Sequence, residues 1–490
     1  MIPEKIKLIS KEISNNGGCA FLVGGSVRDH LLKSPVKDFD VEVYGLKLPA
    51  LKKIVGRYGK AKEVGKTFGV IKIFTKEELE IDFSLPRKDI KIARGHRGFK
   101  ITTDPALNYK KALKRRDFTI NSILLDPLTG EFIDPFNGRE DLKKRVLRVT
   151  DKTTFAEDPL RVLRAIQLVA RYELKIEPRS RKIIKAAAPR LKELSKDRIW
   201  TEWKKLLLAH RPSLGLEAAR ELGLTKTFYP MLAALEKTHE NPAWHPEKNV
   251  WQHCKLTADQ AALIAATEKL NLFESTLLVL AGICHDLGKP LTSRIVNGVR
   301  RTIGHAKAGE KPAREFLKAI GAPNIYYKKI LGLVLYHMRP LSWYLGKEEF
   351  SSAGIRRLAR DLHPYGLTFR ELARLSLADN RGLGEFPPAQ RLEKKREKER
   401  FITFLKKLEK RAASLRVLSA QPKAVVSGRD LLKLGFKPGP NIGAAMRLAE
   451  DLGDLNFKKT AILKKMGKIT RDNTEKKVIL KLQSLVKTRQ

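Results

Sequence analysis

The pattern of apolar and polar positions divides the chain into two parts. Up to about residue 126, short apolar or alternating runs mix with helical segments, and beyond that point apolar residues follow the spacing of helices almost continuously. The sequence has no internal repeat of fixed period. The pattern therefore predicts an α/β head followed by an all-α remainder.

Three short segments of the head have the pattern of strands. Residues 20–23 form an apolar run, whereas residues 38–43 and 79–83 alternate between polar and apolar side chains. Successive side chains of a strand point to opposite faces of its sheet. Asp38 and Asp40 therefore share one face, and two such carboxylates could hold a divalent metal ion.

The first of these strands ends at Gly24 and Gly25. Because glycine has no side chain, backbone N–H groups at this turn can approach a polyphosphate. Arg28 lies near the start of the following helix, where its guanidinium could bind phosphate oxygens. A Gly-Gly turn is also common as a plain turn, and the acidic strand face, which includes Glu42, is also typical of a solvated surface.

Composition narrows the partners and the compartment. The chain has 490 residues and a formal net charge of +44, which indicates about three domains and a polyanionic partner. Charge alone excludes neither DNA nor an anionic membrane. No apolar run approaches the roughly 18 residues that span a bilayer, and the N-terminus lacks a signal-peptide core. Cys19, Cys254 and Cys284 lack disulfide or zinc-ribbon spacing, which favours the cytoplasm.

The order of strand, Gly-Gly turn, helix and acidic strand resembles the head of the DNA polymerase β nucleotidyltransferase superfamily. This resemblance implies that Asp38 and Asp40 are catalytic and bind Mg²⁺. It implies that Asp82, in the second alternating segment, is the third catalytic carboxylate and activates the attacking hydroxyl. A surface aspartate on a strand is the alternative for Asp82.

Residues 114–121, KRRDFTIN, resemble a motif of class II tRNA nucleotidyltransferases and bacterial poly(A) polymerases. Arg115 and Arg116 could contact a triphosphate. Asp117 and Asn121, four apart on one predicted helical face, could fix the ribose and the arginines.

Residues 157–164, EDPLRVLR, match the EDxxR element of the same family, which implies that Asp158 and Arg161 select the base and that Arg164 belongs to the nucleotide site. Cytosine and adenine both present an amino donor beside a ring-nitrogen acceptor, so a carboxylate and a guanidinium can read them. Uracil and guanine present an acceptor to the carboxylate, a mismatch that polar sites reject. Asp158 before Pro159 is also a good helix start, and both roles can hold together.

A second set of chemistry-bearing residues lies far along the chain. In order, they are His253, His285, Asp286, His305, His337 and Asp379. Imidazole and carboxylate together suit a divalent transition metal of unknown identity, although a single histidine is more often a core or surface residue. The set resembles the H…HD…D pattern of HD phosphohydrolases. That resemblance implies hydrolysis of cyclic or terminal phosphates by a metal-activated water.

The resemblance covers almost the whole chain, which is identified as a member of the class II CCA-adding tRNA nucleotidyltransferase and poly(A) polymerase family with an HD domain. It implies an α/β nucleotidyltransferase head with a polymerase β-like mixed sheet, followed by an all-α neck, an HD domain and a tail. The predicted boundaries are 1–145 for the head, 146–240 for an RNA-binding neck, 241–388 for the HD domain and 389–490 for a basic tail that contacts tRNA.

Three basic segments of the helical part carry further predictions. Residues 179–205 are expected in the neck with Trp200 and Trp203 in the core, although their lysines and arginines could follow phosphate. Residues 391–410 are expected to form a helix with one apolar face against the body. Residues 427–440 resemble a C-terminal element of the family.

The resemblance implies that C, C and A are added from CTP and ATP to the acceptor end of tRNA without a nucleic-acid template. The HD set and residues 241–247, NPAWHPE, favour this activity over poly(A) polymerase. An enzyme that adds only CC or only A is a nearer alternative, and the apparently full-length loop at residues 87–104 argues only weakly against a CC-only enzyme. A further hypothesis is a degenerate RNA-binding head with HD hydrolysis as the sole activity. The oligomeric state is left open.

Overall fold

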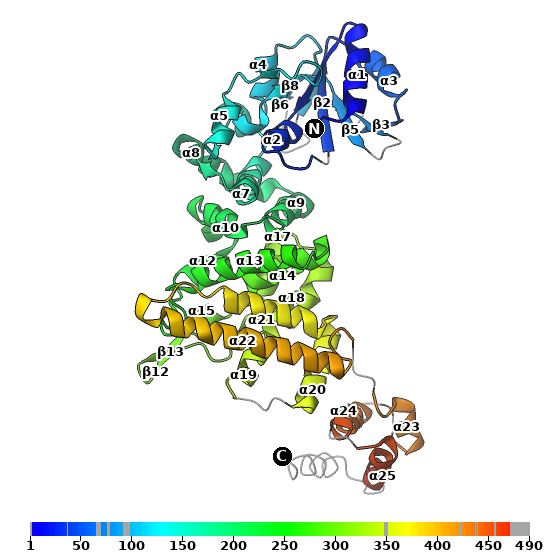
Figure 1. The fold of residues 1–490 in the computed structure, drawn as a ribbon, viewed down its shortest axis with the longest axis vertical. Coiled ribbons are helices and arrows are strands. Elements are labelled where there is room, and N and C mark those ends of the chain that lie inside the picture. The colour runs from blue at the N-terminus through cyan, green and yellow to red at the C-terminus, as the bar shows by residue number, and fades with distance from the viewer. Residues whose placement is uncertain are drawn as a thin grey trace. The chain divides into compact units, whose positions relative to one another are not determined.

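The computed structural model describes most of the chain. The described residues are 2–36, 38–64, 70–75, 79–91, 99–346, 351–420, 424–436, 438, 440–454 and 457–470. The chain splits into two compact units, Met1–Pro230 and Met231–Gln490. Figure 1 shows that the large sheet belongs to the first unit and that the second is built mainly of helices.

The first unit begins with an α/β segment and continues in helices. Its elements are α1 (Glu4–Asn15), β1 (Cys19–Val23), α2 (Gly25–Leu31), β2 (Asp38–Tyr44), α3 (Leu48–Val55), β3 (Lys60–Val64), β4 (Val70–Phe74), β5 (Glu80–Ser84), β6 (Arg87–Lys91), β7 (Phe99–Thr103), α4 (Tyr109–Lys114), the 3₁₀ helix η1 (Thr119–Asn121), β8 (Leu124–Leu125), β9 (Phe132–Ile133), α5 (Gly138–Lys143), β10 (Val146–Leu147), α6 (Lys152–Phe155), α7 (Leu160–Tyr172), β11 (Lys175–Ile176), α8 (Pro178–Ala187), η2 (Ala188–Glu193), α9 (Lys196–Leu207), α10 (Pro212–Glu221) and α11 (Leu224–Phe228).

The second unit is almost entirely helical. After α12 (Pro230–Glu236), which starts at the boundary, its elements are α13 (Val250–Thr267), α14 (Leu272–Cys284), α15 (Lys289–Thr292), β12 (Arg294–Val296), β13 (Val299–Arg301), α16 (His305–Ala308), α17 (Glu310–Ile320), α18 (Asn324–Tyr336), α19 (Arg339–Tyr344), α20 (Ser352–Leu362), η3 (His363–Tyr365), α21 (Phe369–Arg381), α22 (Pro388–Ser414), α23 (Gly428–Lys433), α24 (Pro440–Asp454) and α25 (Lys459–Thr470).

A seven-stranded mixed sheet forms the centre of the head. Its strand order is β3-β4-β5-β2-β1-β8-β9, and β2 pairs with β5 in parallel while the other neighbours are antiparallel. Because β2 and β5 run in the same direction, their residues pair in the same order along both strands, from Asp38 with Glu80 to Glu42 with Ser84. The predicted mixed sheet is confirmed.

The alternation of β2 gives this strand one apolar face and one face that carries Asp38, Asp40 and Glu42. Phe39 and Val41 belong to the main core, together with Ile6, Ile9 and Ile13 of α1. Each of these three isoleucines is fully buried, a contribution of roughly 1.5–3 kcal/mol per side chain. On the opposite face, the carboxylates are followed by Tyr44, which packs in a second, smaller apolar cluster with Phe21 and Leu113.

The helical neck encloses the tryptophan that the sequence places in the core. Trp203 of α9 is 1% exposed and its Nε1 donates to the hydroxyl of Tyr229 at 2.8 Å. Trp200 is partly buried. The core prediction is therefore confirmed for Trp203, and α9 packs with α7 and α10 into one helical layer.

The pattern beyond residue 126 predicts helices throughout, and the structure corrects this at several short strands. Residues 132–133, 146–147 and 175–176 are extended, and residues 294–301 form a two-stranded hairpin. The loop expected at 87–104 also contains strands, because β6 pairs antiparallel with β7. The strands beyond residue 126 have only two or three residues each, which is too short to carry a recognisable period.

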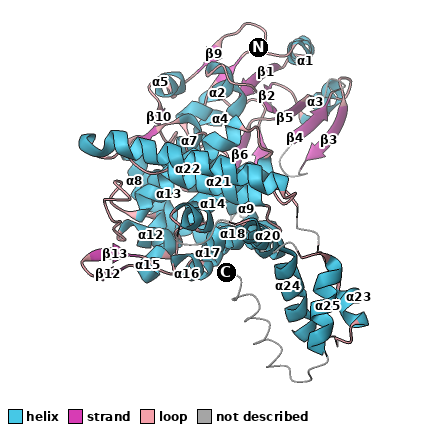
Figure 2. Ribbon diagram, turned by 60° about the horizontal axis from the view of Figure 1, so that its bottom comes forward, coloured by secondary structure: helices cyan, strands magenta, loops and turns pink. Residues whose placement is uncertain are grey.

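The end of the second unit has its own apolar core. Leu431, Leu448 and Ile462, from α23, α24 and α25 respectively, are buried together. Arg360 of α20 forms ion pairs with Glu450 and with Asp454 of α24. Figure 2 shows α23, α24 and α25 gathered as one group of helices.

Residues 391–410 lie within α22, as predicted, and on its expected apolar face Phe401, Leu405 and Leu408 are buried while Phe404 is partly buried. Within residues 427–440, the segment that resembles a C-terminal element of the family, residues 437 and 439 lie outside the described part of the chain. The four predicted domain boundaries stay predictions, since the contacts divide the chain only into two units.

In the described residues, no helix is long and apolar enough to cross a membrane. Cys19, Cys254 and Cys284 are free thiols.

Candidate functional site

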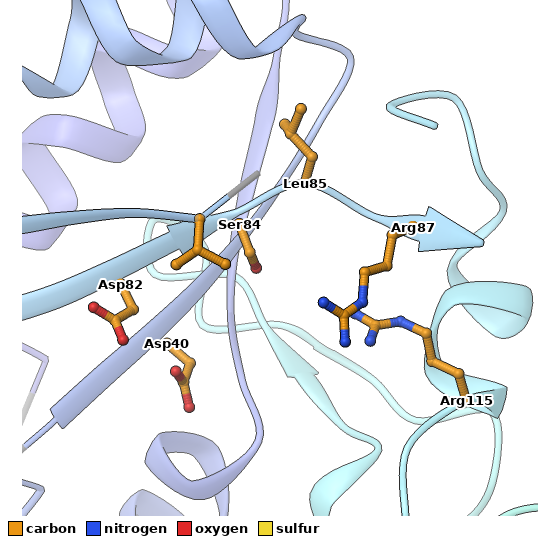
Figure 3. A pocket seen from close by; sticks show the side chains of 7 residues that line it. Asp40, Asp82, Ser84, Leu85, Arg87 and Arg115 are labelled. Carbon is orange, nitrogen blue, oxygen red and sulfur yellow. The ribbon is translucent and has the colours of Figure 1, made fainter. Parts of the chain in front are cut away.

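Two aspartates of the head meet because their strands are paired. Asp40 of β2 stands opposite Asp82 of β5 in the parallel register, and Asp38 stands opposite Glu80. Asp40 and Asp82 line a cavity of about 210 Å³ together with Arg87 and Arg115. Figure 3 shows the two carboxylates on one side of this cavity and the two guanidinium groups on the other.

Electrostatics at these carboxylates favour a cation. Burial raises the pKa of Asp40, and the negative charges of Asp82 and Asp38 add to the rise, while Arg116 opposes it. Burial likewise raises the pKa of Asp82, with Lys72 opposing. Carboxylates that repel one another in a partly desolvated site are stabilised in their ionised form by a divalent ion. The residues present therefore fit a metal ion.

Lys72 is a site residue that the sequence analysis missed. It stands opposite Asp82 in the β4–β5 register, and its Nζ lies 3.3 Å from Asp82 Oδ1. The same ammonium forms an ion pair with Glu80. The alternation of residues 70–74 could have placed Lys72 on a polar strand face, but only the pairing of strands puts it beside Asp82.

Gly24 permits the close approach of two site residues. Its φ is +74°, and an added Cβ would lie 3.1 Å from Nη1 of Arg116 and 3.5 Å from Oδ2 of Asp40. At Gly25 an added Cβ would lie 3.4 Å from Nη2 of Arg28. The glycine turn therefore lies against the predicted triphosphate-binding arginines and one predicted metal ligand.

Glu42 is the buried centre of an arginine pair. Its side chain is fully buried, and its Oε2 accepts from Arg115 at 3.2 Å and from Arg116 at 3.3 Å. The hydroxyl of Tyr44 donates to Oε1 at 2.6 Å. Burial would raise the pKa of Glu42, but the two arginines outweigh it and lower the pKa. The sequence placed Glu42 on the acidic face but gave it no role.

Arg28 lies inside the protein. Its Nη1 donates to Asn121 Oδ1 at 2.7 Å, its Nη2 donates to the Tyr172 hydroxyl at 2.6 Å, and its Nε donates to Asp29 at 2.9 Å. The side chain is 7% exposed. These contacts connect α2 to α7, and they do not test the predicted phosphate contact.

Asp117 and Asn121 meet as the motif predicts, although not on an α-helix. Asn121 Nδ2 donates to Asp117 Oδ1 at 3.0 Å, and Asp117 precedes the short 3₁₀ helix η1. Arg164 of α7 donates through Nε to Asp117 Oδ2 at 2.6 Å. Burial would raise the pKa of Asp117, but Arg164 and Asn121 outweigh it and hold the pKa at about 2.

The two predicted base-reading residues have protein partners in this structure. Asp158 accepts from the backbone of Leu160 at 3.1 Å, as a helix start should, and from Nη2 of Arg198 at 3.2 Å. Arg161 donates to the backbone carbonyls of Thr154 and Arg115. Arg198 is a neighbour that no sequence motif indicated.

The second predicted set of residues comes together in the second unit. His253 lies in α13, His285 caps α14 and is followed by Asp286, His305 starts α16, His337 caps α18 and Asp379 lies in α21. Capping boxes fix the starts of α14 and α21, where Asn271 pairs with Glu274 and Thr368 with Glu371.

Four of these side chains surround one point. His253 Nε2 lies 2.9 Å from Asp379 Oδ1 and 3.3 Å from His285 Nε2. Asp286 Oδ2 lies 3.1 Å from His285 Nε2 and 3.8 Å from His253 Nε2. Ligands of one tetrahedral ion with bonds near 2.1 Å lie about 3.4 Å apart, so the four atoms fit one metal ion.

The other oxygen of Asp286 faces the remaining two histidines. Oδ1 lies 3.4 Å from His305 Nε2 and 3.7 Å from His337 Nε2, and these two nitrogens are 3.1 Å apart. Oδ1 is buried and accepts no hydrogen bond among the described residues. The geometry therefore suits a second ion, with the Asp286 carboxylate between the two.

Backbone contacts orient three of the imidazoles. The Nδ1 atoms of His285, His305 and His337 lie 2.9, 2.7 and 2.7 Å from the carbonyls of Gly282, Thr302 and Val334. A neutral imidazole that donates from Nδ1 has its lone pair at Nε2, which here points into the cluster. Burial lowers the pKa of His305 to about 4, which favours this neutral form.

Charged neighbours complete the centre, and sequence motifs indicated only one of them. Glu247, from the NPAWHPE segment, lies 2.8 Å from His253 Nδ1, and its Oε1 lies 2.9 Å from His245 Nδ1. Lys289 is buried between Asp286 and Glu240, at 2.7 Å from each. A carboxylate behind a predicted ligand histidine and a lysine beside a predicted ligand carboxylate both restrict the movement of these side chains.

Comparison with known proteins finds relatives for both the head and the helical part of the chain. Family models match residues 20–148 (Poly A polymerase head domain), 173–235 (Probable RNA and SrmB- binding site of polymerase A) and 250–380 (HD domain). A multifunctional CCA protein of Mannheimia succiniciproducens is 33% identical over 371 residues, covering 74% of this chain and 84% of that protein. One of Xylella fastidiosa is 36% identical over 317 residues, covering 64% and 72%.

Solved structures share the fold. A Bacillus stearothermophilus CCA-adding enzyme in complex with CTP matches with a TM-score of 0.59 and 20% identity, covering 100% of this chain and 99% of that one. A tRNA nucleotidyltransferase complexed with a primer tRNA and an incoming ATP analog matches with a TM-score of 0.54 and 23% identity, covering 82% and 98%.

The fold and the two sites define a nucleotidyltransferase head combined with an HD domain in one chain. The chain belongs to the family of multifunctional CCA proteins. The family, the α/β head and the HD domain predicted from the sequence are thereby confirmed.

Proposed function

We propose that this protein adds C, C and A to the 3′ end of tRNA, using CTP and ATP and no nucleic-acid template. The observation that carries the proposal is the pairing of Asp40 with Asp82 beside a cavity that Arg87 and Arg115 also line. Carboxylates that can hold metal, facing guanidinium groups that can hold phosphate, are what nucleotidyl transfer requires.

The carboxylates of the head divide the work. Asp38 and Asp40 would hold Mg²⁺, and Asp82 would accept the proton of the attacking 3′-hydroxyl. When bound, Mg²⁺ would offset the charge of the triphosphate and of the reacting oxygens. Lys72, 3.3 Å from Asp82, would limit the movement of that carboxylate.

Phosphate binding falls to Arg115 and Arg116. Glu42 holds them together, and Gly24 leaves room for Arg116. The two guanidinium groups carry more positive charge than Glu42 offsets, so the pair can still attract a triphosphate. Gly25 and Arg28 would complete this side of the site, with Arg28 also connecting α2 to α7.

Nucleotide selection is assigned to the segment around α7. Asp117, Asn121 and Arg164 would position the ribose side, and Asp158 with Arg161 would read the base. The carboxylate of Asp158 accepts from Arg198 and is 36% exposed, so the acceptor positions left on its two oxygens would take the amino group of cytosine or adenine.

The HD centre would provide a second activity, phosphohydrolysis of terminal or 2′,3′-cyclic phosphates during tRNA end repair. The six predicted ligands would hold divalent transition metal, which would supply a hydroxide at neutral pH. Lys289 and Glu247 would keep Asp286 and His253 in place.

The partner is proposed to be the acceptor end of tRNA, which the net charge of +44 supports. Relatives named as complexes with CTP, with an ATP analog and with tRNA support the same choice. We propose a cytoplasmic location and the four domains at 1–145, 146–240, 241–388 and 389–490, with the last domain contacting tRNA.

The test supplies purified protein and Mg²⁺ with tRNA that ends at the discriminator base. CTP and ATP are given separately and together, and the 3′ ends are sequenced. Growth that stops at CCA supports the proposal. A long A tail would indicate a poly(A) polymerase, and addition of only CC or only A would indicate a partial enzyme. No growth would leave HD hydrolysis as the main activity.

A further inference from the structure

A basic hairpin lies in the chain between two predicted metal ligands of the HD centre, Asp286 and His305. It consists of β12 and β13, which pair antiparallel and are joined by a turn at Asn297 and Gly298, both with positive φ. Figures 1 and 2 both show it extending from the helices next to α15. The hairpin has no other strand to pair with among the described residues.

The base of the hairpin is fixed to the metal centre. An added Cβ at Gly288 would lie 2.0 Å from the carbonyl oxygen of His305 and 2.5 Å from the nitrogen of Gly309, so the segments before and after the hairpin are in close backbone contact. Lys289, next to Gly288, forms its ion pair with Asp286. The strands therefore rise from residues that contact the predicted metal ligands.

The charge of this segment has a single sign. Residues 287–304 contain one lysine and three arginines and no acidic residue. Arg294 stands directly opposite Arg301, so both side chains lie on one face of the ribbon. Arg300 donates to the Ser293 hydroxyl at 3.0 Å. Within the described part of the chain, none of the three arginines forms an ion pair.

This arrangement costs stability, which separates it from an ordinary solvated face. Like charges directly opposite each other destabilise an antiparallel pair, and a two-stranded ribbon is only marginally stable by itself. Leu291, Ile295 and Ile303 are also 66%, 65% and 63% exposed around the arginines. A surface that combines unpaired guanidinium groups with exposed apolar side chains suits the phosphates and the sugar and base faces of a nucleic acid strand.

We infer that the hairpin of residues 291–303 binds the RNA backbone next to the terminal phosphate that the HD centre hydrolyses. The inference rests on the proposed phosphohydrolase function of that centre. RNA phosphates would lie along Arg294 and Arg301, and this contact would hold the strand end near the metal ions. A mononucleotide has no neighbouring phosphates and would reach the centre without this help.

The test compares two substrates of the same chemistry. The full-length protein, supplied in turn with Mn²⁺ and Ni²⁺, is given 2′,3′-cyclic AMP or a tRNA whose 3′ end carries a 2′,3′-cyclic phosphate. The variant Arg294→Ala/Arg301→Ala should lose roughly tenfold in kcat/KM on the RNA and keep its activity on the mononucleotide. The salt dependence on RNA should also fall, by a log–log slope of about 1.4 for two lost contacts to a single strand.

A matched variant controls for net charge. Lys311→Ala/Arg314→Ala removes the same number of positive charges from exposed positions of α17 and should leave both substrates unaffected. Equal losses on RNA in both variants would show a general charge effect and overturn the hairpin assignment. Equal losses on both substrates in the hairpin variant would indicate damage to the metal centre and would also overturn it.

If the wild type hydrolyses the mononucleotide and the hairpin variant keeps the wild-type kcat/KM on RNA, the inference alone is contradicted. Wild-type protein that hydrolyses neither substrate with either metal would contradict the phosphohydrolase proposal and, with it, this inference.

Discussion

At the scale of single residues, the head concentrates charge of both signs in a partly buried space. Asp40 and Asp82 are held side by side by strand pairing, and burial raises the pKa of both. Nearby, Glu42 is buried with two arginines. Such arrangements are costly for folding, and they suit a site that binds a metal ion and a polyphosphate.

Asp40→Ala should abolish nucleotide incorporation. Removing one of the two carboxylates proposed to hold Mg²⁺ should cost most of the transition-state stabilisation, so we expect a loss of at least about a thousandfold in kcat/KM. Primer extension on tRNA with labelled CTP measures it, and unchanged melting temperature shows that the fold survives. Incorporation at the wild-type rate would show that Asp40 holds no catalytic metal.

Glu42→Gln should weaken the positioning of Arg115 and Arg116. The amide keeps the shape but exchanges two charge-assisted hydrogen bonds for weaker ones, so we expect kcat/KM for CTP to fall roughly tenfold. Glu63→Gln, which alters the exposed ion pair with Lys52, is the matched control. If both variants kept wild-type kcat/KM, the arginines would hold their positions without Glu42.

At the scale of elements, single contacts connect segments far apart in sequence. The ion pair of Asp117 with Arg164 holds the segment before η1 to α7, and Arg28 connects α2 to Tyr172 at the end of α7. In the second unit, Gly288 and Gly309 bring α15 and α16 close enough for Lys289 and His305 to reach Asp286.

Asp117→Asn should destabilise the protein in a pH-dependent way. The pKa of Asp117 is about 2 in the fold and 3.8 ordinarily, so its charge contributes stability above about pH 4 and loses it as the pH falls toward 2. At pH 7 we expect a loss of roughly 2 kcal/mol in the free energy of unfolding. Denaturant unfolding at several pH values measures it, and a difference that grew toward low pH would contradict the sign.

Gly288→Ala should damage the HD centre selectively. The added Cβ would collide with the carbonyl of His305, so α15 and α16 must separate and metal affinity should fall by about ten- to a hundredfold. Isothermal titration calorimetry with the metal ion measures this affinity. Gly443→Ala, where an added Cβ meets nothing within 4 Å, should bind metal as the wild type does. Equal affinity in both variants would contradict the close packing.

At the scale of the whole molecule, two centres with different chemistry lie in separate compact units. The head combines carboxylates with arginines, and the second unit combines histidines with carboxylates. Hard oxygen ligands suit magnesium, whereas imidazole suits transition metals, so each centre can select its own ion.

Asp286→Ala should abolish metal-dependent phosphohydrolysis and spare nucleotide incorporation. Asp286 offers one oxygen to each predicted metal position, so its loss affects both at once. Asp40→Ala should show the reverse behaviour, and the two variants control for each other in the same pair of assays. Loss of both activities in the Asp286 variant would instead indicate a folding defect or coupling between the units.

The order and spacing of residue types along the chain were sufficient to predict much of this protein. Alternation placed Asp38, Asp40 and Glu42 on one strand face, and the ordered histidines and aspartates indicated the HD centre. Local order could not give Lys72 or Arg198, because each becomes a site residue only through pairing or packing with a distant segment.

The sequence by itself determined the class of the head, the acidic strand and the glycine turn, because these depend on residue types at short spacing. The order of histidines and aspartates along the chain likewise predicted the six residues of the HD centre. The tertiary structure alone decided that Asp82 stands beside Asp40, that Arg28 turns inward to Asn121, and that Asp286 lies between two groups of imidazoles. These facts depend on which strands pair and which helix ends meet, and local patterns carry no information about either.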